Sequence, residues 1–253
     1  MTPLAILLLC CVMLGTAFLS GIFGMAGGLV LIGVLLALLP LPEAMALHAV
    51  TQIASNFWRG LLWRKHILWR PLLAVGAGFG LALLLWSLVG WVPDKPLALL
   101  ALGITPFLVK LMPARLAPDP HSPAQGLAYG TAAMSLMLLT GVSGPLIDRF
   151  FLGRKEGGGG LDRRQIVATK AAGQILGHAL KLGYFGGLAS QTASLDWRIA
   201  CAAVLCSILG TTLARRILEA MTDTQYRRWT DRLIAAVSGT YILYGITLLA
   251  LPE

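Results

Sequence analysis

The sequence predicts an all-α protein that crosses a membrane several times. Charged residues occupy only 12% of the 253 positions and apolar residues occupy 57%, whereas about 25% of a soluble domain is charged. The first charged side chain is Glu43, so the opening apolar run exceeds the roughly 20 residues of one membrane helix. A globule of this size has too little interior for so many apolar side chains. The composition therefore excludes a soluble enzyme.

Apolar segments separated by short polar gaps give the predicted helices in chain order. The long segments are residues 3–23, 44–63, 71–92, 96–112, 125–144, 165–188, 199–218 and 233–251. Two short segments, 29–39 and 145–152, follow glycine-rich breaks and are too short to span a bilayer, so we expect half-helices there. Residues 113–123 are rich in proline and form the expected linker. We therefore expect two membrane repeats, residues 1–118 and 119–253.

Three landmarks recur in the same order in both halves. The first is a Gly-x-x-Gly break after a long apolar helix, at residues 21–24 and 141–144. The second is a polar segment with matched threonines, Thr51 and Thr169, and the third is a Trp-Arg pair before the next helix, at 69–70 and 197–198. This order predicts an internal duplication.

The distribution of Lys and Arg over the loops favours inverted repeats. Suppose that, in each half, the first long helix and the short segment after it form a hairpin, so that the chain returns to the side of the membrane from which it entered. The loop cations then gather on one face, which is the cytoplasmic face of a membrane protein, and only Lys95 and Arg198 lie on the other. Counting each hairpin as one crossing scatters the cations over both faces. We expect each repeat to hold one glycine-broken helical hairpin and three spanning helices, with both termini outside.

Several other functional classes are disfavoured by the placement of polar residues. The net charge is +9, but the cations occupy short gaps rather than a basic arm or face, so we expect no nucleic-acid partner. The four cysteines lie inside apolar stretches without ligand spacing, so we expect no metal or cofactor. No carboxylate pair or His–carboxylate cluster lies where hydrolytic chemistry would need it. We do not expect an enzyme.

The two glycine breaks are candidate anion sites. Glycines lower helix stability, and a helix that starts inside the membrane directs its partially positive N-terminus toward the interior. The backbone N–H groups of such a turn can bind an anion. The alternative is close helix packing over small residues. The residues concerned are Gly24, Gly27 and Gly28 in the first half and Gly141 and Gly144 in the second.

The helix after each break carries a polar stripe at steps of three to four residues, which places its members on one face. Polar groups at this depth face a bundle interior or a water path, although interhelical hydrogen bonding is an alternative. The candidate binding residues are Thr51, Gln52, Ser55 and Asn56 in the first half, followed by Arg59, and Thr169, Lys170, Gln174 and His178 in the second, followed by Lys181.

Three ionisable residues carry alternative roles. Lys170 either extends to the cytoplasmic interface or meets an anion, and we favour the anion. His178 could carry a proton alongside the substrate, although a lone helical histidine is more often simply hydrogen-bonded. Asp148 either pairs with Arg149 at the interface or couples a cation, and we favour the pairing.

The chain resembles the TauE/SafE sulfite-exporter family of bacterial inner-membrane permeases. The resemblance covers residues 14–249 and rests on the Gly21-to-Gly28 break, the Ala-Val-Thr run ending at Thr51, the break from Gly141 to Pro145, and Val167-Ala-Thr169 with Gln174 and His178. It implies two membrane repeats that carry a small sulfur-containing anion, such as sulfite or an organosulfonate, across the lipid bilayer. A membrane subunit that docks a partner and a passive anion channel remain alternatives. The sequence predicts no oligomeric state.

Overall fold

The structure is a computed structural model that describes residues 3–23, 25–113, 118–152, 161, 163–188 and 197–250. Every regular element in these residues is helical, which confirms the predicted all-α class. The elements are α1 (Pro3–Phe23), α2 (Met25–Leu38), α3 (Leu41–Leu62), the 3-10 turn η1 (Arg64–His66), α4 (Trp69–Val89), α5 (Lys95–Leu111), α6 (Pro123–Thr140), α7 (Gly144–Leu152), α8 (Arg163–Gly183), the π-helical turn η3 (Tyr184–Leu188), α9 (Trp197–Ala220) and α10 (Asp223–Ala250).

Local sequence signals explain several helix ends. The Asp94 carboxylate accepts a hydrogen bond from the backbone N–H of Leu97 and caps the start of α5. Ser122 does the same for α6, with Pro123 in the first turn, a position where the missing proline N–H costs nothing. Helix α4 ends at Gly90, whose φ of 63° lies in the left-handed region that glycine adopts without strain.

Both predicted glycine breaks separate two helices. In the first half, α1 ends at Phe23 and α2 begins at Met25, on either side of Gly24, which lies outside the described residues. In the second half, α6 ends at Thr140, Gly141 takes a φ of 88°, and α7 begins at Gly144. Because the left-handed φ at Gly141 stops the helix, α7 starts in a new direction.

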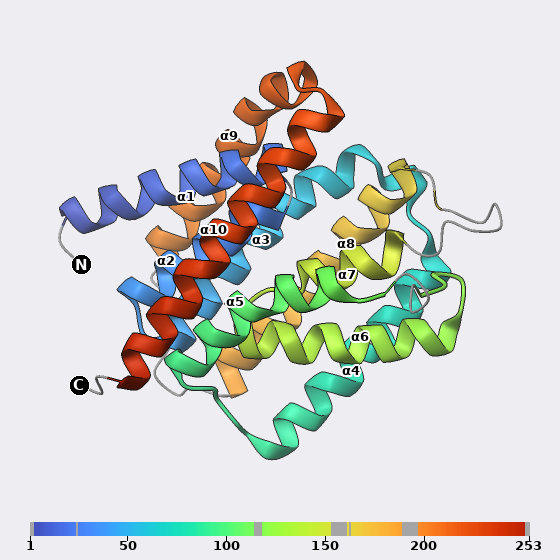
Figure 1. Ribbon diagram of the computed structural model, residues 1–253, viewed down its shortest axis with the longest axis horizontal. Coiled ribbons are helices and arrows are strands. Elements are labelled where there is room, and N and C mark those ends of the chain that lie inside the picture. The colour runs from blue at the N-terminus through green and yellow to red at the C-terminus, as the bar shows by residue number, and fades with distance from the viewer. Residues whose placement is uncertain are drawn as a thin grey trace.

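The main packing pairs join helices that are distant in the sequence. Helix α4 packs on α6, α1 on α9, α3 on α8, and α5 on α10. In Figure 1 the α1–α9 pair lies at one end of the molecule and the α4–α6 pair at the other, with α3 between them. The two polar helices α3 and α8 thus face each other inside the bundle.

Small residues let the outer pairs approach closely. A Cβ atom at Gly130 of α6 would meet the Val75 carbonyl of α4, and one at Gly210 of α9 would meet the Leu14 carbonyl of α1. Close backbone approach over glycine is a usual basis of helix association in lipid. Close helix packing over glycine therefore operates at these two positions.

Three helices of the described residues are long and apolar enough to cross a membrane, Trp69–Val89, Trp197–Ala214 and Arg228–Ala250. Large apolar side chains are exposed along them, including Leu88, Leu209 and Leu243. Contiguous apolar surface of this extent is typical of proteins that contact lipid. The half-helices α2 and α7, with 14 and 9 residues, are too short to span a bilayer.

Candidate functional site

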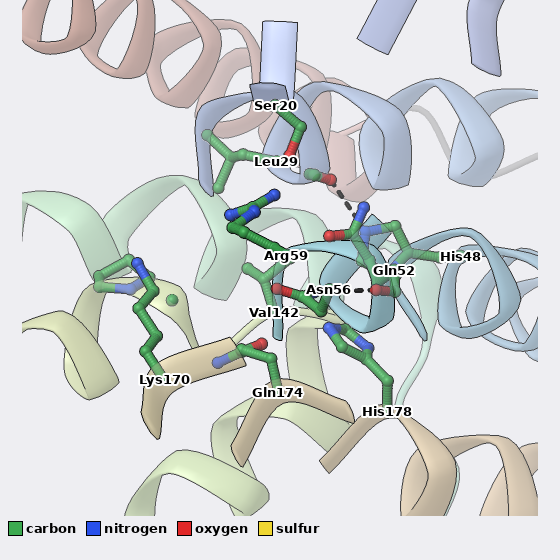
Figure 2. Close-up of a pocket in the computed structure, with 13 residues that line it drawn as sticks. Ser20, Leu29, His48, Gln52, Asn56, Arg59, Val142, Lys170, Gln174 and His178 are labelled. Carbon is green, nitrogen blue, oxygen red and sulfur yellow. Dashed lines mark hydrogen bonds between the residues drawn. The ribbon is translucent and has the colours of Figure 1, made fainter. Parts of the chain in front are cut away.

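A small polar pocket lies where the first and second halves of the chain meet. Its volume is about 40 Å³, enough for on the order of three water molecules. Figure 2 shows its lining side chains converging from several helices. The lining residues are Ser20, Gly28, Leu29, His48, Gln52, Asn56, Arg59, Val142, Gly144, Pro145, Lys170, Gln174 and His178.

Helix α3 supplies one wall of the pocket. His48, Gln52, Asn56 and Arg59 lie at successive helical turns and therefore share a face. The Asn56 amide donates to the Gln52 carbonyl, 2.8 Å away, and the Arg59 guanidinium donates to the Ser55 hydroxyl at 3.3 Å. This face is the predicted polar stripe of the first half, extended one turn toward the N-terminus by His48.

Helix α8 supplies the opposite wall. Lys170, Gln174 and His178 lie at steps of four residues, and in Figure 2 Gln174 and His178 point toward Asn56. The Gln174 amide donates to the Ser143 hydroxyl at 3.2 Å, which ties α8 to the glycine break of the second half. The wall contains three of the second-half residues predicted to bind an anion.

The two breaks close the pocket with helix N-terminal turns. Gly28 lies in the first turn of α2 and Gly144 is the first residue of α7. The first four N–H groups of a helix have no intrahelical acceptor and carry partial positive charge. A Cβ atom at Gly28 would come within 3.1 Å of the Gln52 amide, so glycine allows the backbone to approach the α3 wall.

A fully buried cluster of three ionisable side chains lies beside the pocket. Lys181, on α8, has no exposed surface, and its ammonium donates to Nδ1 of His48 at 2.8 Å and to the Gly141 carbonyl at 2.9 Å. Nε2 of His48 donates to the Gly28 carbonyl at 3.0 Å. The rings of His48 and His178 meet edge to face with centroids 5.4 Å apart. We call His48, His178 and Lys181 the buried cluster.

Lys170 and Lys181, the two lysines at the pocket, have a single carboxylate partner between them among the described residues. Within the described ranges the ion pairs are Lys110 with Asp231, on the exposed surface, and Lys170 with Asp148. Lys181 belongs to neither pair. Its ammonium instead meets the Gly141 carbonyl at the C-terminal end of α6, where the helix dipole is negative. The partial charge of a helix end offsets only part of the full charge on Lys181.

The partner of Lys170 differs from both roles considered above. Its ammonium pairs with the Asp148 carboxylate on α7, while Arg149 donates to the carbonyls of Met112 and Pro113. The favoured Asp148–Arg149 pairing is therefore wrong. Lys170 and Asp148 lie on different helices, and only the tertiary fold brings them together.

Four of the predicted site residues make other contacts in the structure. The Thr51 hydroxyl donates to the His48 carbonyl within α3, and Ser55 contacts the Thr211 hydroxyl of α9. The Thr169 hydroxyl accepts from the backbone N–H of Leu68. A Cβ atom at Gly27 would meet the α1 backbone at Thr16 and Ser20. None of the four lines the pocket, and Ser55, Thr169 and Gly27 contact other segments of the chain.

The other predicted residues divide between the pocket and its surroundings. Gly28, Gln52, Asn56, Gly144, Lys170, Gln174 and His178 line the pocket. Gly141 contributes the carbonyl that holds Lys181, and Gly24 lies outside the described residues. His48 was not among the predicted residues, although it precedes Gln52 by four residues and extends the same stripe.

The fold and the pocket define an all-helical membrane protein with a buried polar site between its two halves. The chain belongs to the sulfite exporter TauE/SafE family, whose model matches residues 7–241, nearly the whole chain. Members of that family are membrane transporters and not enzymes. No curated protein and no solved structure matches the chain.

Proposed function

We propose that this protein carries small sulfur-containing anions, such as sulfite or organosulfonates, across a bacterial inner membrane. The observation that carries the proposal is the pocket between α3 and α8, which is lined by polar side chains of both halves. Lys170 lines this pocket and Lys181 lies beside it, whereas the ion pairs between described residues give these two lysines a single carboxylate, that of Asp148. An anion supplies the missing negative charge.

The pocket offers several kinds of donor to an oxyanion. Gln52, Asn56 and Gln174 carry side-chain amides, and the N-terminal turns at Gly28 and Gly144 present backbone N–H groups. Uncharged donors around a tetrahedral or pyramidal anion can hydrogen-bond to several of its oxygens at once, and they add no further positive charge to the pocket. We assign binding of the oxygens to these five residues and assign charge compensation to Lys170, Arg59 and the buried cluster.

The pattern of helix packing supports two repeats with a pseudo-twofold relation. Let α1 to α5 correspond in order to α6 to α10. Under this correspondence the α4–α6 pair is equivalent to the α9–α1 pair, and the α3–α8 and α5–α10 pairs are each equivalent to themselves. The weaker α3–α9 and α8–α4 contacts exchange as well. Inverted repeats of this kind transport by moving one group of helices against the other around a central site. We assign the repeats to residues 1–118 and 119–253.

The position of the polar stripes favours a transporter over a docking subunit. A docking subunit would present its polar residues on the rim of the bundle, whereas Gln52, Asn56 and Gln174 line an interior pocket. A pocket of about 40 Å³ also favours a carrier with one discrete site over an open channel.

An uptake assay in proteoliposomes tests the proposal. Labelled sulfite, sulfoacetate and methanesulfonate are offered to liposomes that contain the purified protein, with chloride and acetate as comparison anions and protein-free liposomes as the control. We expect at least one sulfur anion to enter faster than acetate and to exchange against its unlabelled form in counterflow. Equal entry into liposomes with and without protein would refute the proposal, and uptake without counterflow would indicate a channel.

A further inference from the structure

Hydrogen bonds in the buried cluster leave one ring nitrogen unused. An ammonium only donates, so the Lys181 contact assigns the lone pair of His48 to Nδ1 and its proton to Nε2, which donates to Gly28. Both nitrogens of His48 are thereby occupied. Nδ1 of His178 is buried and has no hydrogen-bond partner among the residues that the structure describes. Buried ring nitrogens without a partner are rare because the lost hydrogen bond to water is not replaced.

That unused nitrogen belongs to a residue that faces the pocket. His178 is 2% exposed and lines the pocket together with Gln174 and Asn56. An anion placed between these amides would have an oxygen near the His178 ring. The His178 ring therefore lies where a proton on it would place a positive charge beside a bound anion.

The charges around His178 oppose a proton in the empty pocket. Lys181 belongs to the same cluster, and the pocket lining contributes the cations Arg59 from α3 and Lys170 from α8. The carboxylate nearby is Asp148 of α7, which pairs with Lys170. The pocket linings from α1 and α2 and from residues 142 to 145 contain no acidic or basic side chain. A second positive charge beside Lys181 in the buried interior is costly until a negative charge enters.

We propose that His178 takes up a proton when an anion binds in the pocket, with His48 and Lys181 as the fixed partners that hold its ring and set the local charge. The inference rests on the proposed function and identifies the proton as the ion that is coupled to anion transport. Since linkage is reciprocal, an anion that favours the protonated ring is itself bound more tightly at low pH. One proton would then cross with each anion.

Calorimetry on the purified full chain tests the linkage directly. Methanesulfonate and sulfoacetate are the probes because their own charge stays constant between pH 6 and pH 8, unlike that of sulfite. Titration in two buffers with different ionisation enthalpies gives the number of protons taken up per anion bound. We expect about one proton near neutral pH, and a dissociation constant that falls by up to about tenfold per pH unit as the pH decreases.

Histidine variants locate the proton. Any anion binding that His178→Gln retains should occur without proton uptake and with an affinity that no longer depends on pH. His66→Gln and His121→Gln, whose side chains do not line the pocket, are the matched controls and should keep the proton. Proton uptake that persists when His178→Gln binds the anion would overturn the assignment of the proton to His178.

The wild-type measurement decides the proposal even if a variant fails to fold. Anion binding with no proton uptake and no pH dependence would overturn proton linkage and leave the transporter proposal standing. Absence of binding by both probes, together with absence of sulfite transport, would overturn the proposed function itself and this inference with it.

Discussion

Two lysines on α8 lie three turns apart and have different surroundings. Lys170 lines the pocket and pairs with Asp148, and its side chain is 20% exposed. Lys181 is fully buried and is held by an imidazole and a carbonyl. Both residues lie on the sequence stripe, from which we favoured Lys170 for the anion. The burial of each lysine and the Asp148 partner depend on how α7 and α3 pack on α8. The structure places the uncompensated charge at Lys181.

Replacing Lys181 with methionine tests its role in charge compensation. The Lys181→Met side chain has similar length and no charge, so we expect anion uptake to fall by at least about tenfold, the equivalent of 1.4 kcal/mol. Exchanging a buried charge for a hydrophobic side chain is often neutral or stabilising, so the unfolding temperature should not fall. Lys110→Met, on the exposed surface, is the control. Parental uptake in Lys181→Met would remove this residue from the site.

The Asp148–Lys170 pair sets the net charge at one side of the pocket. Asp148→Asn removes one negative charge and should tighten anion binding several-fold at low salt, whereas Lys170→Met should weaken it. The double variant should return toward the parental affinity, because the pair as a whole is neutral. A binding titration of all four proteins measures the coupling. Unchanged anion affinity in both single variants would show that the ion pair does not set the charge of the pocket.

At the scale of helices, the sequence predicts the order of the elements. It does not predict which helices pack against each other. Apolar length and glycine breaks predict the ten helices, and the half-helix expected at 145–152 is observed as Gly144–Leu152. The stripe on α3 predicts Gln52 and Asn56 at the pocket. Thr51 and Thr169 satisfy the same periodicity but contact backbone groups. A spacing of three or four residues gives only the approximate side of a helix, so it does not tell which members of the stripe reach the pocket. His48 was not predicted, because the predicted stripe begins one turn later, at the matched threonine Thr51.

Close packing of α4 on α6 gives a prediction with a control on the same helix. A Cβ atom at Gly78 would meet the Leu127 carbonyl of α6, whereas one at Gly80 has nothing within 4 Å. Gly78→Ala should therefore lower stability by roughly 1–3 kcal/mol through overpacking. Gly80→Ala should raise it by about 0.5–1 kcal/mol, because alanine favours the helix. Thermal unfolding in detergent compares the two. Equal effects would contradict the described α4–α6 contact.

At the scale of the whole molecule, the pocket lies where the two halves meet. The helix contacts of one half correspond to those of the other, and α3 and α8 pack against each other. A movement of one half relative to the other would therefore change both walls of the pocket. Repeat transporters expose such a site to one side of the membrane at a time. The sequence predicted the duplication, but only the fold shows that its two polar stripes face each other.

Accessibility of a single thiol in the pocket is the most direct measurement of the central claim, that an anion binds between the halves. After the four cysteines are replaced, Gln174→Cys is treated with a membrane-impermeant thiol reagent from each side of the membrane, with and without sulfite, sulfoacetate or methanesulfonate. We predict labelling from both sides and protection by a transported anion, whereas lipid-facing Leu209→Cys stays unlabelled. Labelling of Gln174→Cys that no anion reduces, or no labelling from either side, would contradict the account.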